Sequence, residues 1–278
     1  MKKRLFPLLL LFPLLISGCS LRLATLMGWA DTYMLSNLDD YFQFNSEERD
    51  EIRSDLNSTL ADVQREDFPA LAGTLESLAG SLEKQQLKPA QAQHALNDVE
   101  ARLQQALSRF EPVAQKWMNE KAKSNFDFFD RQFLKKLNED KSKVSDEKKQ
   151  ASETRKRYNR WIGETIEFLT DDQKTKLDQF IKQNPFPSTA KLESRRLIFE
   201  KFQAARKDPE ARHQFIKKLF TDWDSLQTEA YQTEQKKYQE ALRSFIVDQM
   251  INLNDHQRRN FIHHLKDRAQ ELRKLALH

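Results

Sequence analysis

The sequence predicts an all-α protein, an elongated bundle of long amphipathic helices. Only 5 of the 278 residues are Gly, which disfavours a β-rich fold with many tight turns. The chain is rich in Glu, Lys, Gln, Leu and Ala, which form helices readily. It also carries 19 regularly spaced Phe, more bulky apolar surface than a disordered chain of this charge would hold.

In the first half of the chain, apolar periodicity predicts a helix over 21–41 and a second over 45–66. Phe68-Pro69 ends the second helix, because the residue before Pro disfavours the helical conformation. A third helix is expected over 70–86. The next begins at Pro89, which suits a first turn, and continues to Phe110. Helical structure resumes along the Phe126, Phe129 and Phe133 stripe.

The polar stretch 138–147 is the best candidate for a linker, and so for a boundary between two lobes. Long helices are then expected over 146–168 and 171–182. Asn184-Pro185-Phe186-Pro187 is the clearest non-helical break. Further helices are predicted over 190–206, 209–251 and 255–275. The middle one is so long that it should curve, kink or extend partly clear of the core.

Residues 1–18 have the form of a lipoprotein signal peptide. Lys2, Lys3 and Arg4 precede a short apolar run that ends in Ser17-Gly18 before Cys19, the only cysteine. Such a run is too short to span a membrane, which takes about 20 residues. We therefore expect cleavage before Cys19, acylation of its thiol (for example by palmitate), and a mature region 19–278 anchored to membrane lipid.

The charge balance of that mature region argues against nucleic acid as a partner. The chain has 46 basic and 42 acidic residues. Removal of the three basic residues of the signal peptide leaves 43 basic and 42 acidic residues in the mature region. Nucleic-acid binding needs a clustered basic excess. With Cys19 acylated, no intramolecular disulfide remains possible.

Three segments read as capping boxes at helix starts. In each, the N-cap side chain can accept a hydrogen bond from a backbone N–H of the first turn, and a Glu or Gln three residues later can accept one from the backbone N–H of the N-cap residue. The pairs are Asn45 with Glu48, Thr170 with Gln173, and Asn254 with Gln257. A weaker copy runs from Leu87 to Gln91. We interpret these motifs as structural.

The same letters, Leu169-Thr170-Asp171-Asp172-Gln173 and Leu253 to Gln257, resemble the LTxxQ motif of small periplasmic stress proteins of the spheroplast-protein-Y type. That resemblance implies a helical surface that binds unfolded client proteins.

The region after the signal resembles an uncharacterised family of proteobacterial lipoproteins, known only as a domain of unknown function. The resemblance is carried by Ala30-Asp31-Thr32, by Leu38-Asp39-Asp40-Tyr41-Phe42, and by the cap at Asn45. It implies an all-helical lipoprotein over the whole mature chain and supplies no activity.

Two further places are candidates for contact with a partner protein. Asp39, Asp40 and Tyr41 form a polar cluster, although adjacent carboxylates do not share a helix face and would more simply end a helix. Phe128 falls off the apolar stripe between Asp127 and Asp130, so we expect it to be exposed.

No catalytic residue, metal site or cofactor is predicted. The nucleophile elbow, the phosphate loop and the His-Glu-x-x-His motif are absent from the sequence. His256, His263 and His264 are close in sequence, but zinc needs three or four supported ligands and Arg258 and Arg259 would repel a cation.

The leading functional hypothesis is a lipid-anchored protein that faces the periplasm and binds other envelope proteins, as a scaffold or a chaperone, without chemistry. Ser20 is not the Asp that retains lipoproteins at the inner membrane, so the outer membrane is the expected location. The alternative is a cell-envelope enzyme, such as a cell-wall hydrolase, with an unrecognised carboxylate site.

Overall fold

The protein is all-α, as predicted. A computed structural model describes residues 23–120, 125–144 and 147–277, and within them it contains helices and no strand. The elements are α2 (Leu23–Gly28), α3 (Ala30–Asp39), α4 (Ser46–Glu66), α5 (Phe68–Glu83), α6 (Pro89–Ser108), α7 (Glu111–Glu120), α8 (Phe126–Val144), α9 (Glu147–Ile166), α10 (Asp171–Gln183), α11 (Ser188–Ala205), α12 (Pro209–Thr221), the 3₁₀ helix η2 (Trp223–Leu226), α13 (Glu229–Ile251) and α14 (Asp255–Leu275).

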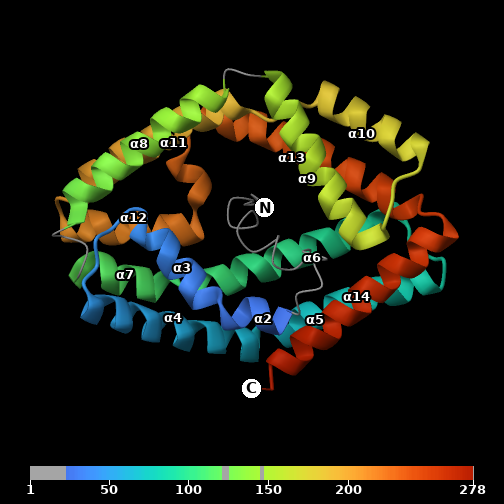
Figure 1. Cartoon of the computed structure of the whole chain (residues 1–278), viewed down its shortest axis with the longest axis horizontal. Helices are drawn as coiled ribbons and strands as arrows, with labels where there is room; N and C mark the ends of the chain where they lie inside the picture. Colours follow the sequence, from blue (N-terminus) through green and yellow to red (C-terminus); the bar gives the residue numbers. More distant parts are fainter. Residues whose placement is uncertain (1–22, 121–124, 145–146, 278) are drawn as a thin grey trace.

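The helices follow an oval outline (Figure 1), with α4, α5 and α14 along its lower edge and α8, α11, α13, α9 and α10 along its upper edge. The last helix, α14, packs most extensively on α5 and also contacts α2, α4 and α9. The first described helix therefore meets the last. Leu23 is buried against Ala269 and Leu272, and its backbone N–H donates to Glu271 Oε2 at 3.4 Å.

The buried apolar residues form three clusters. The first joins α2 to α7 with the C-terminal half of α14. The second joins α5 and α6 with α9, α10, α13 and the first half of α14. The third lies between α11, α12 and η2, with Phe126 and Phe129 of α8 packed against it. Because α14 contributes to two clusters, its apolar face connects the first cluster to the second.

Several predicted boundaries agree with the structure. The helix expected over 255–275 is α14, and the break at Asn184 to Pro187 separates α10 from α11. The helix expected over 21–41 is instead interrupted at Trp29, which divides α2 from α3.

The prediction of a single long helix over 209–251 is wrong. The chain leaves the helical path after Thr221, makes the turn η2, and restarts at Thr228, whose hydroxyl accepts from the Tyr231 N–H at 3.3 Å. The interruption buries Trp223 and Leu226 in the third cluster. Burial of these two side chains and the local cap together outweigh helix propensity.

Most of the polar stretch 138–147 is helical, because α8 continues to Val144 and α9 begins at Glu147. Asp140 within it forms an ion pair with Arg195 on α11. The second cluster joins residues from both sides of this stretch, such as Leu78 and Ile162.

Residues 1–18 and Cys19 lie outside the described residues, so the predicted signal peptide and acylation site have no structural counterpart here. Within the described part of the chain, no helix is both long and apolar enough to cross a bilayer.

Candidate functional site

Asp39, Asp40 and Tyr41 lie where α3 ends, as the turn interpretation predicted. The carboxylate of Asp39 accepts from Arg49 Nη1 on α4 at 2.6 Å. Asp40 pairs with Lys136 on α8, whose ammonium lies 4.7 Å from the centre of the Tyr41 ring. Each side chain thus holds α3 to a neighbouring helix, and this cluster has an evident structural role.

The capping box at α4 is confirmed and lies on the surface. Asn45 Oδ1 accepts from the Glu48 N–H at 2.9 Å, and Glu48 Oε2 accepts from the Asn45 N–H at 2.9 Å. At α6 the box is half-formed. Gln91 Oε1 accepts from the Lys88 N–H at 2.9 Å, but the Lys88 ammonium has no acceptor to offer in return.

The boxes at α10 and α14 are confirmed too. The Thr170 N–H donates to Gln173 Oε1 at 2.9 Å, and Thr170 Oγ1 accepts from the Gln173 N–H at 3.3 Å. The Asn254 N–H donates to Gln257 Oε1 at 3.2 Å, and Asn254 Oδ1 accepts from the Gln257 N–H at 2.9 Å. Both copies therefore satisfy the first-turn amides as the sequence predicted.

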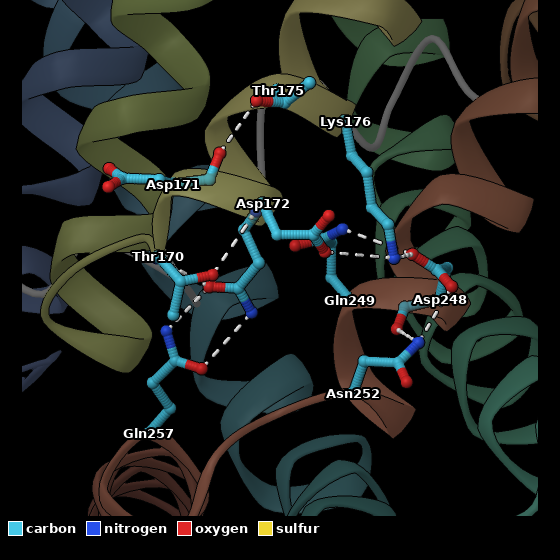
Figure 2. Close-up of polar contacts among 10 residues, drawn as sticks. Thr170, Asp171, Asp172, Thr175, Lys176, Asp248, Gln249, Asn252 and Gln257 are labelled. Carbon is cyan, nitrogen blue, oxygen red and sulfur yellow. Dashed lines mark hydrogen bonds and ion pairs between the residues drawn. The ribbon is translucent and has the colours of Figure 1, made fainter.

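The two glutamines also bind each other, which sequence reasoning missed. Gln257 Nε2 donates to Gln173 Oε1 at 2.7 Å and to the Phe168 carbonyl at 2.8 Å, and Gln173 Nε2 donates to Gln257 Oε1 at 3.2 Å. Gln173 is 4% and Gln257 0% exposed. Figure 2 shows Gln257 of α14 reaching the start of α10 beside Thr170. The two motif copies, 84 residues apart, form one buried junction.

A surface network continues from this junction to α13 (Figure 2). Lys176 Nζ lies 3.2 Å from Asp248 and 3.4 Å from Asp172. The hydrogen bond that Lys176 donates to Asp248 is the main reason that the pKa of Lys176 is raised. Asp248 also accepts from the Asn252 amide at 2.8 Å. The start of α10 is thus tied to both α13 and α14 by groups that bind one another, and we assign this junction a structural role.

The best candidate for a binding site is a pocket of about 300 Å³ bounded by the C-terminal end of α8, by α9, by α11 and by Tyr238 of α13. It is lined by Asp140, Val144, Lys149, Gln150, Glu153, Thr154, Arg157, Phe186, Ser188, Lys191, Leu192, Arg195 and Tyr238. We call this the α9–α11 pocket. Four of these side chains are basic and two are acidic.

An aromatic group forms one wall of the α9–α11 pocket. Phe186 packs edge-on against Tyr238, with ring centroids 5.2 Å apart. The Lys191 ammonium lies 5.3 Å from the Phe186 centroid. The hydroxyls of Tyr238 and Tyr158 are 3.2 Å apart. Burial raises the pKa of both phenols, so both stay neutral.

The buried carboxylates lie away from this pocket and are each paired with arginine. Asp67 Oδ2 accepts from Arg109 Nε at 2.5 Å, and Glu100 Oε2 accepts from Arg243 Nη2 at 2.5 Å. Such pairs join helices and leave no acid free for proton transfer. In the described residues, no three His, Cys, Asp or Glu side chains gather where they could hold a metal ion.

His256 and His263 of α14 form separate surface contacts, whereas His264 is half-buried. His256 lies 3.6 Å from Glu167 and 5.6 Å, by ring centroids, from Phe168, and His263 lies 3.1 Å from Asp267. Phe128 is half-buried rather than fully exposed, and the Arg131 guanidinium lies 5.9 Å from its ring centroid.

The clearest exposed aromatic pair lies near the N-terminus. Trp29 is 67% and Tyr33 62% exposed, and they are four residues apart, so they share a helix face. Both fall in the helix predicted over 21–41, and sequence analysis assigned neither a role.

These observations define an all-helical protein with internal structural caps, paired buried charges and one surface pocket with aromatic and cationic walls. Residues 40–232 match the model of a family of unknown function, DUF6279, so the chain belongs to that family. The match excludes α2, α3, α14 and most of α13, whereas the sequence resemblance had been expected to extend over the whole mature chain. No curated protein and no solved structure matches the chain.

Proposed function

We propose that this protein is a lipoprotein, anchored in the outer membrane through acylated Cys19 and facing the periplasm, that binds other envelope proteins without catalysing a reaction. The observation that carries the binding role is the α9–α11 pocket. Its wall joins aromatic rings to ammonium and guanidinium groups, a combination that suits recognition. The buried carboxylates of Asp67 and Glu100 are paired with arginines outside the pocket, and the two carboxylates of its lining, Asp140 and Glu153, pair with Arg195 and Lys156.

The aromatic pair Trp29 and Tyr33 supports the membrane-anchored arrangement. Leu23, where α2 begins, lies four positions after Cys19, so an anchor at Cys19 would hold the start of α2 within about 14 Å of the lipid headgroups. Trp and Tyr are enriched at that depth because their rings are apolar with a polar edge. The exposed pair is therefore suited to the membrane surface.

Acylation of Cys19 is tested by metabolic labelling with an alkyne fatty acid. Wild-type protein should be labelled and should fractionate with membranes, and the Cys19→Ala variant should be unlabelled and released or mislocalised. Unlabelled wild-type protein would contradict the anchor. Separation of inner and outer membranes on a density gradient tests the location.

Partner binding is tested by a photo-crosslinking amino acid in the full-length, membrane-anchored protein. At Thr154, which lines the α9–α11 pocket, it should yield a discrete adduct whose protein component is the same in every replicate. At Asn159, an exposed position of the same helix outside the lining, the adduct should be absent. Equal crosslinking at both positions would contradict a role for the pocket.

The same experiment separates the scaffold from the chaperone version. A scaffold gives one dominant adduct. A chaperone, which the LTxxQ resemblance favours, gives many, and the purified protein then also suppresses light scattering by a denatured test protein at near-stoichiometric ratio. Release of soluble fragments from purified cell wall by the protein would instead support the hydrolase alternative and overturn the binding role.

A further inference from the structure

The α9–α11 pocket holds two cationic groups that have no anionic partner at bonding distance. The Arg195 guanidinium pairs with Asp140, and Glu153 pairs with Lys156 outside the pocket at 3.2 Å. Within the described part of the chain, no carboxylate lies within 4 Å of the Lys191 ammonium or of the Arg157 guanidinium. The lining therefore has an excess of positive charge at these two residues.

Lys191 is the less solvated of the two. Its side chain is half-buried, against the Phe186 ring. Burial, and then repulsion from Arg195, lower the pKa of its ammonium. The Asp140 carboxylate partly opposes this shift in the pKa of Lys191, and Arg157 on α9 adds a smaller repulsion. A desolvated cation beside two other cations is destabilised unless an anion reaches it.

We propose that the α9–α11 pocket binds a carboxylate that a peptide segment of the partner protein carries next to an apolar side chain. Lys191 and Arg157 hold the carboxylate, and Phe186 and Tyr238 pack against the apolar side chain. This inference rests on the proposed function and names the chemistry that the partner must present.

The walls favour a carboxylate over a more highly charged anion. Among the described residues of the lining, Lys191 and Arg157 are the two cations without a carboxylate at bonding distance, and the polar groups of Ser188 and Gln150 are engaged with each other and with the backbone. Ser188 Oγ donates to Gln150 Oε1 at 2.5 Å, and Gln150 Nε2 donates to the Val144 carbonyl at 2.6 Å. The remaining wall is aromatic and aliphatic. A monoanion flanked by an apolar group matches both features, and a guanidinium can bind it through two parallel hydrogen bonds.

The size of the pocket also fits one side chain and its carboxylate. About 300 Å³ is at the small end of ligand pockets. It accommodates a single residue of a peptide, while the rest of the segment would lie along the exposed faces of α9 and α11. A folded domain could not enter it.

The test uses the full mature protein and two matched probes, acetyl-Ala-Ala-Phe with a free carboxylate and the same peptide with a C-terminal amide. Titration calorimetry should give binding of the acid and at least tenfold weaker binding of the amide. Lys191→Met and Arg157→Gln should each weaken binding of the acid about tenfold, as expected for one lost charge-assisted hydrogen bond. Phe186→Ala should weaken both probes.

Arg196→Gln is the matched control, because Arg196 lies on α11 but pairs with Glu200 at the surface. It should bind the acid like the wild type. Equal affinity for acid and amide, or unchanged affinity in Lys191→Met, would overturn the proposal. Tighter binding of acetylphenylalanine than of the tripeptide would overturn the peptide assignment, since a small acid would then suffice.

Thermal unfolding gives a second readout that does not need a ligand. Removal of a partly desolvated cation without an anionic partner should raise the Tm, so Lys191→Met should be more stable than the wild type while binding the acid more weakly. A lower Tm would mean that the ammonium has a structural partner and would contradict the site. Neither result depends on acylation of Cys19 or on capture of the partner, so failure here is distinguishable from failure of the proposed function.

Discussion

The capping box of α4 and the boxes of α10 and α14 satisfy the same backbone groups in opposite surroundings. Glu48 completes its box at the protein surface, whereas Gln173 and Gln257 complete theirs in the interior and bind each other. In these three boxes the third helical residue is a carboxylate at the surface and an amide in the interior, although the exposed half-formed box of α6 also uses an amide, that of Gln91. Because an uncompensated buried charge is far more costly than a hydrogen-bonded amide, burial excludes the carboxylate, and only the buried boxes bind each other across helices distant in sequence.

The largest effect should follow from placing a charge in the buried box. Gln257→Glu replaces the amide that donates to Gln173 and to the Phe168 carbonyl with an acceptor, and should lower the unfolding free energy by about 3–5 kcal/mol at pH 7. Urea unfolding followed by circular dichroism measures it. The matched exchange in the exposed box, Glu48→Gln, should change stability by less than about 0.5 kcal/mol. Equal small effects would mean that the junction is hydrated.

A double-mutant cycle tests whether the two buried boxes act as one unit. Gln173→Leu and Gln257→Leu should each cost about 2–3 kcal/mol, because each leaves a buried amide without its partner. The double variant removes both partners, so its cost should be about 1–2 kcal/mol less than the sum. Additive costs would show that the hydrogen bonds between Gln173 and Gln257 contribute nothing to stability.

His264 on α14 should make the stability of the protein depend on pH in the acid range. Burial, and then Arg268, lower its pKa to about 4, with Asp267 opposing and His263 adding to the shift. Since an unfolded His has a pKa near 6.5, the unfolded chain takes up the proton first as the pH falls. Stability should therefore drop by about 1–3 kcal/mol between pH 6.5 and pH 4. His264→Gln should flatten that part of the profile, and an unchanged slope would contradict the assignment.

The N-cap residues should show the smallest effects. Thr170→Ala and Asn254→Ala should each cost about 0.5–2 kcal/mol, and Asn45→Ala should fall at the low end of that range because water can replace its bond. Thermal or urea unfolding of the three variants ranks them. If Asn45→Ala proves the most costly, burial does not govern the strength of these caps. Loss of partner binding without loss of stability in Thr170→Ala would show that the motif has a functional role.

The sequence was sufficient to predict the features that depend only on residues close together in the chain. The three boxes depend on residues three apart, and α14 has both its cap and its periodic apolar face within its own segment. The Gln173–Gln257 pair could not be predicted in the same way. Each capping box uses only the Oε1 atom of its glutamine, so the local pattern does not determine what the Nε2 group binds. The unassigned Nε2 group of each glutamine was the one available sign that a further acceptor lies nearby.

Tertiary burial accounts for the other differences. The break between α12 and α13 occurs because Trp223 and Leu226 pack against α11 and α12, a contact that no local pattern encodes. Lys191 and Arg157 look like ordinary solvated charges in a chain in which 32% of residues are charged. Only the folded arrangement brings these two side chains to the lining of one pocket.

The contact between α2 and α14 also determines how the molecule carries mechanical load. With the chain held in the membrane at Cys19, as proposed, a pull exerted by a partner is resisted first where Leu23 is buried against Ala269 and Leu272. From there the force passes into α14, whose packing on α5 is the most extensive between any two helices of the described chain. Tension at the anchor is therefore shared by the two ends of the chain together, and α2 is protected from being pulled away alone.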